Sequence, residues 1–195
     1  MVRMALLLGI MLLGFLTNVD QFVSGKENHY VRDACSVTRY KDLCAHSLAS
    51  FSNIAKRSPT KWARAGVSVT IAEVKIVAAD LKKLKRNWYM RGRNRVALSD
   101  CIDCFSDALD ELHRSLGVLR WLSKTTFGTQ MGDINTWISA ALTDEDTCLD
   151  GFEGQKGKRI RLPQNQVLNA TYITCNALAL VNKLASTGLG SITNP

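Results

Sequence analysis

The chain has 195 residues, enough for one domain of ordinary size once any targeting segment is removed. Its 25 Lys and Arg outnumber its 17 Asp and Glu, and the resulting formal net charge of +8 favours weak adhesion to acidic polymers. Outside the N-terminal segment no stretch is apolar enough to cross a membrane, which excludes a membrane protein after removal of that segment.

The N-terminal segment has the pattern of a signal peptide. Arg3 precedes an uninterrupted apolar run over residues 5–16, too short to span a ~30 Å hydrocarbon layer as a helix. Small side chains before Lys26 then offer a cleavage site. We therefore expect a signal peptide over residues 1–25 and a secreted protein, with a retained signal anchor as the alternative. A secretory route also argues against nucleic acid as a partner.

The six cysteines predict disulfides, because secreted proteins fold in an oxidising compartment. They occupy positions 35, 44, 101, 104, 148 and 175, and their number alone does not choose among the possible pairings. Zinc binding is the rival interpretation, since Cys101 and Cys104 form a C-x-x-C. No matching Cys or His pair follows at finger-like spacing, so we expect no metal site and no cofactor.

The first element of the mature chain is predicted to be an α-hairpin over residues 26–57. It consists of two short helices, around His29–Ser36 and Tyr40–Ser50. Such an appendage buries little apolar surface alone, so a disulfide within it is physically sensible.

A long helix is predicted to follow from Ser58 and Pro59, which suit the cap and the first position of a helix. Apolar residues then recur every three or four positions as far as about Tyr89, and Gly92 is expected to cap the end. The residues of this stripe are Val67, Ile71, Val74, Ala78, Leu81, Leu84 and Trp88.

The second long helix has the most regular stripe in the chain, with alternating spacings of three and four. Its members are Leu98, Cys101, Phe105, Ala108, Leu112, Ser115, Leu119 and Leu122.

Two further helices complete the pattern. A loop over Thr125–Gly132 and a cap at Asp133 are expected before the third helix, whose stripe is Ile134, Ile138, Ala141, Cys148 and Phe152. A basic loop over Gly154–Arg161 and Pro163 are expected before the last helix, whose stripe is Leu168, Tyr172, Cys175, Ala179 and Leu184.

Four long amphipathic helices joined by short loops favour antiparallel neighbours. The sequence therefore predicts an all-α protein, an up-and-down antiparallel four-helix bundle over residues 58–186. The hairpin precedes it, and a flexible tail over residues 187–195 follows it.

Four ordered blocks resemble the plant invertase and pectin methylesterase inhibitor family. They are ACSVTRYKDLCAHSL in the hairpin, ALSDCIDCFSDALDEL in the second bundle helix, WISAALTDEDTCLDGFEG in the third and NALALVNKLA in the last. The resemblance covers about residues 30–184. It implies a secreted protein of the apoplast that inhibits an extracellular enzyme and is not itself an enzyme.

The resemblance also implies the disulfide pairing Cys35–Cys44 and Cys101–Cys148. Cys104 and Cys175 remain, and we expect two buried free thiols that act as small hydrophobes. A third bridge between the second and fourth bundle helices is the alternative, and Cys104 could also compete with Cys101 for its partner.

The family inhibits either pectin methylesterases or acid invertases. Its invertase inhibitors use a Pro-Lys-Phe tripeptide, which this chain lacks. The resemblance therefore implies an inhibitor of pectin methylesterase, and an inhibitor of cell-wall or vacuolar invertase is the alternative.

Acidic residues on the second and third bundle helices are the candidate contacts with the target. Asp100, Asp103, Asp107 and Asp110 recur at spacings of three and four and so form one ridge. By resemblance, the second, third and fourth bundle helices cover the substrate cleft of the esterase in a one-to-one complex. An acidic ridge could imitate the polyanionic substrate. The expected partner-binding residues are Asp103, Asp107, Asp110, Asp144, Asp146, Thr147 and Asp150.

Three other classes of function are weaker readings. An enzyme is one alternative, but the three His residues lie far apart in the sequence and suggest no catalytic site. A lipid-carrying bundle is the second, and it would need a continuous cavity. The third is the non-catalytic region of a pectin methylesterase, which by resemblance shares the fold. Because the chain stops at Pro195 without an enzyme domain, we expect a free-standing inhibitor. Two secondary expectations are weak adhesion to acidic pectin and an N-linked glycan at Asn169, in the sequence Asn-Ala-Thr.

Overall fold

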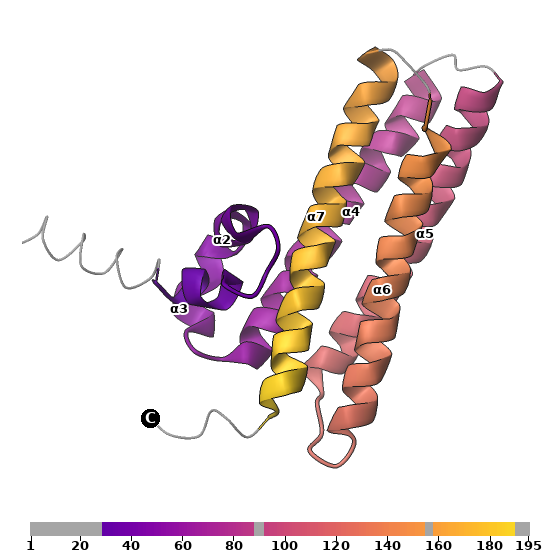
Figure 1. Ribbon diagram of the computed structural model, residues 1–195. Coiled ribbons are helices and arrows are strands. Elements are labelled where there is room, and N and C mark those ends of the chain that lie inside the picture. The colour runs from indigo at the N-terminus through magenta and orange to yellow at the C-terminus, as the bar shows by residue number, and fades with distance from the viewer. Residues whose placement is uncertain (1–28, 88–91, 155–157, 190–195) are drawn as a thin grey trace, which may run out of the picture.

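Figure 1 shows the computed structural model of the chain, in which residues 29–87, 92–154 and 158–189 are described. The expected signal peptide and residues 190–195 of the expected tail lie outside the described residues. The long helices are α4 (Pro59–Asn87), α5 (Arg93–Arg120), α6 (Phe127–Gly151) and α7 (Lys158–Thr187). They pack as an antiparallel bundle in the cyclic order α4, α5, α6, α7. The predicted fold class is confirmed.

Within the described residues, no helix combines the length and the apolar character needed to cross a membrane.

The start of α4 is set by local sequence. The Ser58 hydroxyl accepts a hydrogen bond from the Lys61 N–H at 3.3 Å, and Pro59 is the first helical residue. The predicted stripe faces the core, with Val67 and Val74 fully buried; Trp88 lies outside the described residues. Gly92 does have a positive φ of 58°, but it is the N-cap of α5. Its assignment as a helix C-cap was therefore wrong.

The regular stripe of α5 is buried as predicted from Leu98 through Leu119, and Leu122 just beyond the helix is half-buried. Phe105 and Leu112 have no exposed surface, and Phe152 at the end of α6 is equally buried. These large side chains fill the space between the helices, which is what gives a bundle its stability.

The start of α6 differs from the prediction. The helix begins at Phe127, so Asp133 is an exposed residue inside it and not its cap. The Gln130 side chain explains the difference, because it accepts the Ser123 N–H at 2.8 Å and donates to the Trp121 carbonyl at 3.0 Å. These two bonds tie the first turn of α6 to the end of α5, despite the glycines and threonines that suggested a loop.

The beginning and the buried face of α7 also differ from the prediction. The helix begins at Lys158 and includes Pro163, whose missing N–H costs one hydrogen bond near the helix start. The predicted stripe is largely on the wrong face, since Leu168 is 37% exposed and Tyr172 and Cys175 are only half-buried. The residues of α7 in the core are Val167, Ala170, Ala177, Val181 and Leu184.

The N-terminal hairpin comprises a helix over residues 29–35 and the elements α2 (Lys41–Leu48), η1 (Ala49–Phe51) and α3 (Ser52–Ala55). It lies beside α4 and α7 (Figure 1) and has its own apolar cluster, which includes Trp62 and Leu180 of the bundle. The structure contains the Cys35–Cys44 disulfide within it.

Polar bonds fix the hairpin to α7. The Asn176 side chain accepts the Tyr40 N–H at 3.1 Å and donates to the Tyr40 carbonyl at 3.0 Å. The Tyr40 ring also stacks on Tyr172, with centroids 4.0 Å apart. The Asn176 side chain thus satisfies both backbone polar groups of Tyr40, in the turn of the hairpin.

Candidate functional site

The candidate surface is built on α5 and α6, which are joined covalently. The structure contains the Cys101–Cys148 disulfide, whose Cα atoms are 4.3 Å apart. One turn further along, Gly151 lies beside Ala97, where a Cβ on Gly151 would make ordinary van der Waals contact with the Ala97 Cβ at 3.6 Å. The disulfide therefore holds these helices together at the end that carries most of the acidic residues.

The acidic ridge of α5 points to solvent. Asp100, Asp103, Asp107 and Asp110 are all exposed, because the opposite face of the helix carries the buried stripe. None of these four carboxylates makes an ion pair with another described residue; in the described chain the only ion pair joins Arg114 to Glu111. Their charge is therefore available to a partner.

Asp144 of α6 extends this ridge across the helix interface. Burial raises the pKa of its carboxyl, and the nearby charges of Asp107 and Glu111 raise it further. The half-buried Cys104 thiol shares this environment: burial raises its pKa first, followed by the charges of Asp144 and Asp107. Asp107 and Asp144, predicted as contacts on different helices, thus belong to one negative surface.

Asp146, Thr147 and Asp150 lie on other parts of α6 and are exposed. The Thr147 hydroxyl donates to the Thr143 carbonyl at 2.7 Å, so its oxygen can still accept a bond from outside. Asp146 lies near α7, where its charge helps to raise the pKa of the half-buried Cys175 thiol after burial and Glu145. The predicted contacts therefore surround α6 and do not form a single row.

Glu145 differs from the exposed acidic residues beside it on α6. It has no exposed surface. Its Oε1 accepts a hydrogen bond from the Thr174 hydroxyl at 2.8 Å, and its Oε2 has no partner. Burial raises the pKa of this carboxyl to about 8. A signal was present in the sequence, since position 145 continues the buried stripe between Ala141 and Cys148.

The two remaining cysteines are free thiols in the structure. Cys104 lies on α5 and Cys175 on α7, and each is half-buried beside carboxylates. Neither environment favours the thiolate, which is the reactive form. In the part of the chain that the structure describes, no group of three or more His, Cys, Asp or Glu side chains could hold a metal ion.

Asn169, the predicted glycan acceptor, lies half-buried between α7 and α4. Its side-chain nitrogen donates to Glu73 at 3.1 Å, and the hydroxyl of the buried Thr171 donates to the Val167 carbonyl at 3.1 Å. The Asn169 side chain therefore links α7 to α4.

Comparison with known proteins agrees with this architecture. A family model described as plant invertase/pectin methylesterase inhibitor matches residues 29–180. Pectinesterase inhibitor 6 of Arabidopsis thaliana is 46% identical over 162 residues, 82% of this chain and 77% of that protein. Pectinesterase inhibitor 3 of the same plant is 34% identical over 174 residues, 85% of each chain.

A solved structure supports the fold. The crystal structure of a mutant form of a pectin methylesterase inhibitor from Arabidopsis has a TM-score of 0.61 to this chain. The alignment covers 76% of this chain and 92% of the other, at 21% sequence identity. At that identity the likeness concerns the fold alone.

Proposed function

Since the chain belongs to the plant invertase/pectin methylesterase inhibitor family, we propose that it inhibits pectin methylesterase and so controls pectin de-esterification. It acts by binding and not by catalysis. Relatives named as pectinesterase inhibitors align over most of the chain, and the Pro-Lys-Phe tripeptide of the invertase branch is absent from the sequence.

The observation that carries the mechanism is the unpaired acidic surface of the disulfide-linked helices α5 and α6. An esterase cleft that receives a polyanionic galacturonan would be electrostatically complementary to it. Asp103, Asp107 and Asp144 would occupy positions that substrate carboxylates otherwise take. Because the two helices are crosslinked at Cys101 and Cys148, little conformational entropy would be lost when this surface binds.

We infer a one-to-one complex in which the contact surface continues from α5 around α6. The bound residues would be Asp103, Asp107, Asp110, Asp144, Asp146, Thr147 and Asp150. Asp146 lies near α7, so its engagement requires a partner that reaches past α6.

One assay tests the function. The purified chain is titrated in parallel against a pectin methylesterase and an acid invertase, and we expect inhibition of the esterase only. Saturation at one inhibitor per esterase would support the stoichiometry. Inhibition of the invertase alone would overturn the proposal and favour the alternative target.

We also infer that the chain is secreted to the cell wall after removal of residues 1–25. The supporting observations are the apolar run over residues 5–16 and the two disulfides, which persist in oxidising compartments. The net charge of +8 further supports weak adhesion to de-esterified pectin.

A further inference from the structure

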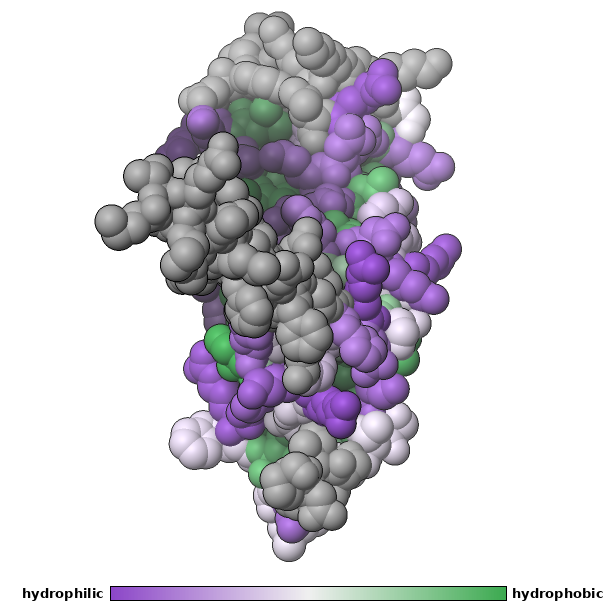
Figure 2. Space-filling view, turned by 90° about the vertical axis from the view of Figure 1, so that its left-hand side faces the viewer, coloured by the Kyte–Doolittle hydropathy of each residue, from purple (hydrophilic) through white to green (hydrophobic). Residues whose placement is uncertain are grey.

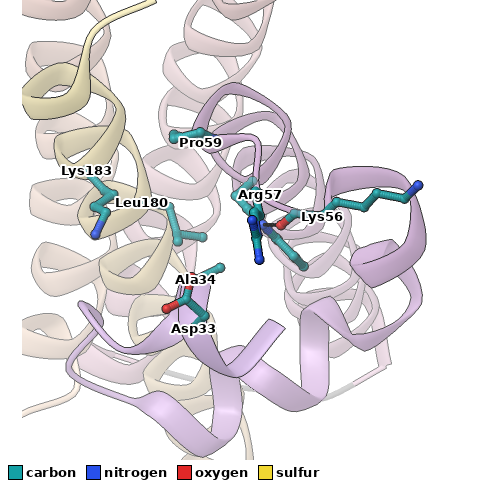
Figure 3. A pocket seen from close by; sticks show the side chains of 8 residues that line it. Asp33, Ala34, Lys56, Arg57, Pro59, Leu180 and Lys183 are labelled. Carbon is teal, nitrogen blue, oxygen red and sulfur yellow. Dashed lines mark hydrogen bonds between the residues drawn. The ribbon is translucent and has the colours of Figure 1, made fainter. Parts of the chain in front are cut away.

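A small pocket lies where the N-terminal hairpin meets the bundle, on the side away from the acidic surface. Its volume is about 70 Å³. Figure 3 shows the side chains that line it. The hairpin, α4 and α7 all contribute to its lining, which consists of Asp33, Ala34, Lys56, Arg57, Pro59, Trp62, Leu180 and Lys183.

One wall of the pocket is held by an unusual turn. Lys56 has a φ of 46°, in the region that favours glycine, and it ends α3 just before α4 begins. The buried Trp62 indole stabilises this turn by donating its Nε1–H to the Lys56 carbonyl at 2.7 Å. The next residue, Arg57, is thereby positioned at the pocket, while the Lys56 side chain extends away from it (Figure 3).

Two cations from different elements reach this pocket, Arg57 after α3 and Lys183 on α7. Asp33 of the hairpin is the acidic group in its lining. None of the three forms an ion pair with another described residue, since the one such pair in the described chain is Arg114–Glu111. The pocket therefore carries one uncompensated positive charge.

The remaining lining is apolar and comes from Ala34, Pro59, Trp62 and Leu180. The side of the molecule shown in Figure 2 is predominantly hydrophilic where it is coloured. A small volume with an apolar wall and two free cations fits a single carboxylate attached to a larger, solvated ligand.

We propose that this pocket receives a uronate carboxylate of a de-esterified galacturonan chain. Arg57 would offer paired N–H donors to the carboxylate and Lys183 a second positive charge, with the sugar ring against the half-buried Pro59. The choice of this polymer rests on the proposed function. Its charge complements the pocket, whereas a methyl-esterified chain presents no carboxylate and would not be held.

The pocket and the acidic surface lie on different helices of the bundle, so both can be occupied at the same time. The hairpin packs on α4 and α7, whereas the acidic surface lies on α5 and α6. The inhibitor can therefore stay on pectin that the esterase has already demethylated while it presents its acidic surface to the enzyme.

Calorimetric titration of the whole secreted chain, without esterase, tests the proposal. The ligands are a de-esterified oligogalacturonide of fixed length and its fully methyl-esterified counterpart, and only the first should bind. Arg57→Gln with Lys183→Gln should weaken binding about fivefold, as the loss of two exposed charge contacts predicts. Asp33→Asn should strengthen it, because a repulsive carboxylate is removed.

The matched control is Lys75→Gln with Lys82→Gln. Both lysines are exposed on α4, at least ~24 Å along the helix from Pro59, and the change in net charge is identical. We expect a loss below about twofold for this control. Equal weakening by both double variants, or binding of the methyl-esterified chain, would overturn the proposal. Oligogalacturonide binding without esterase inhibition would contradict the proposed function alone.

Discussion

The Thr174 hydroxyl of α7 donates a hydrogen bond of 2.8 Å to the fully buried Glu145 carboxyl of α6. The Glu145 pKa is about 8, against an ordinary value of 4.5, because burial disfavours the charged form more than the hydrogen bond from Thr174 favours it. Asp144 and Asp146 on the same helix raise it further. The folded protein therefore holds a neutral carboxylic acid in its core at neutral pH.

This carboxyl makes stability dependent on pH. Below pH 4.5 both the folded and the unfolded state are protonated, and its contribution to stability is fully present. Between pH 4.5 and about 8 only the unfolded state ionises, so stability falls as pH rises. We expect a decrease in Tm of roughly 5–10 °C across this range, for a loss of a few kcal/mol.

Glu145→Gln is the control, because it keeps the shape of the side chain without a titrating proton. Thermal unfolding at several pH values should give a much flatter profile for this variant. An unchanged slope would mean that Glu145 does not cause the pH dependence.

Charge reversal tests the acidic surface. Asp103→Lys with Asp107→Lys should weaken inhibition of pectin methylesterase roughly tenfold to hundredfold, since like charges would then face each other across the interface. Asp42→Lys with Asp133→Lys is the matched control, at two exposed carboxylates away from the ridge. Equal inhibition constants for the wild type and the Asp103→Lys, Asp107→Lys variant would show that the ridge is not part of the binding surface.

The α5–α6 disulfide should be the more stabilising of the two. Cys101→Ser with Cys148→Ser should lower the free energy of unfolding by ~4 kcal/mol, because a crosslink over 47 residues restricts the unfolded chain. The Cys35–Cys44 bridge, over 9 residues, should contribute ~3 kcal/mol or less. Urea unfolding monitored by circular dichroism measures both, with Cys104→Ser as the control for loss of a thiol.

The buried face of α7 is open to a direct test. Leu184→Ala should cost ~2–5 kcal/mol, because Leu184 has no exposed surface and its removal leaves a cavity. Leu168→Ala should cost less than ~1 kcal/mol, because Leu168 is 37% exposed. A similar loss in the free energy of unfolding for the two variants would show that Leu168 belongs to the core.

Glycosylation of Asn169 has a simple readout. Glycan transfer leaves one N–H on the side-chain nitrogen, so the bond to Glu73 can persist beside a glycan. We predict a glycan-bearing fraction in protein secreted by plant cells, seen as a mass shift that an N-glycosidase removes. Asn169→Gln should lack the shift; a wild-type protein without it would contradict the prediction.

The helices that the sequence predicted best are those with one apolar face. The stripe of α5 from Leu98 to Leu119 has polar residues on its opposite side, so its period identifies both the helix and its buried face. In α7, by contrast, Val181 faces the bundle core while Leu180 faces the hairpin cluster. A helix buried on two sides has no unique apolar stripe, and this is why the wrong face was selected.

Side-chain contacts between distant segments could not be predicted from the sequence. The start of α6 depends on Gln130 reaching back to Trp121, and a glutamine gives no signal of such a bond. The proximity of Asp107 to Asp144 could be anticipated once Cys101 and Cys148 were paired by resemblance. The burial of Glu145 was not predicted, because acidic residues are almost never fully buried without a charged partner.

The bonds between Asn176 and Tyr40 connect residues 136 positions apart, and they have a consequence for synthesis. The hairpin leaves the ribosome before the bundle helices, yet its docking site is completed only when α7 has been made. During that interval the Cys35–Cys44 crosslink, which closes within 9 residues, can form without the rest of the protein. The disulfide therefore stabilises the hairpin locally before α7 has been made. Attachment of the hairpin to α7 should be among the final events of folding.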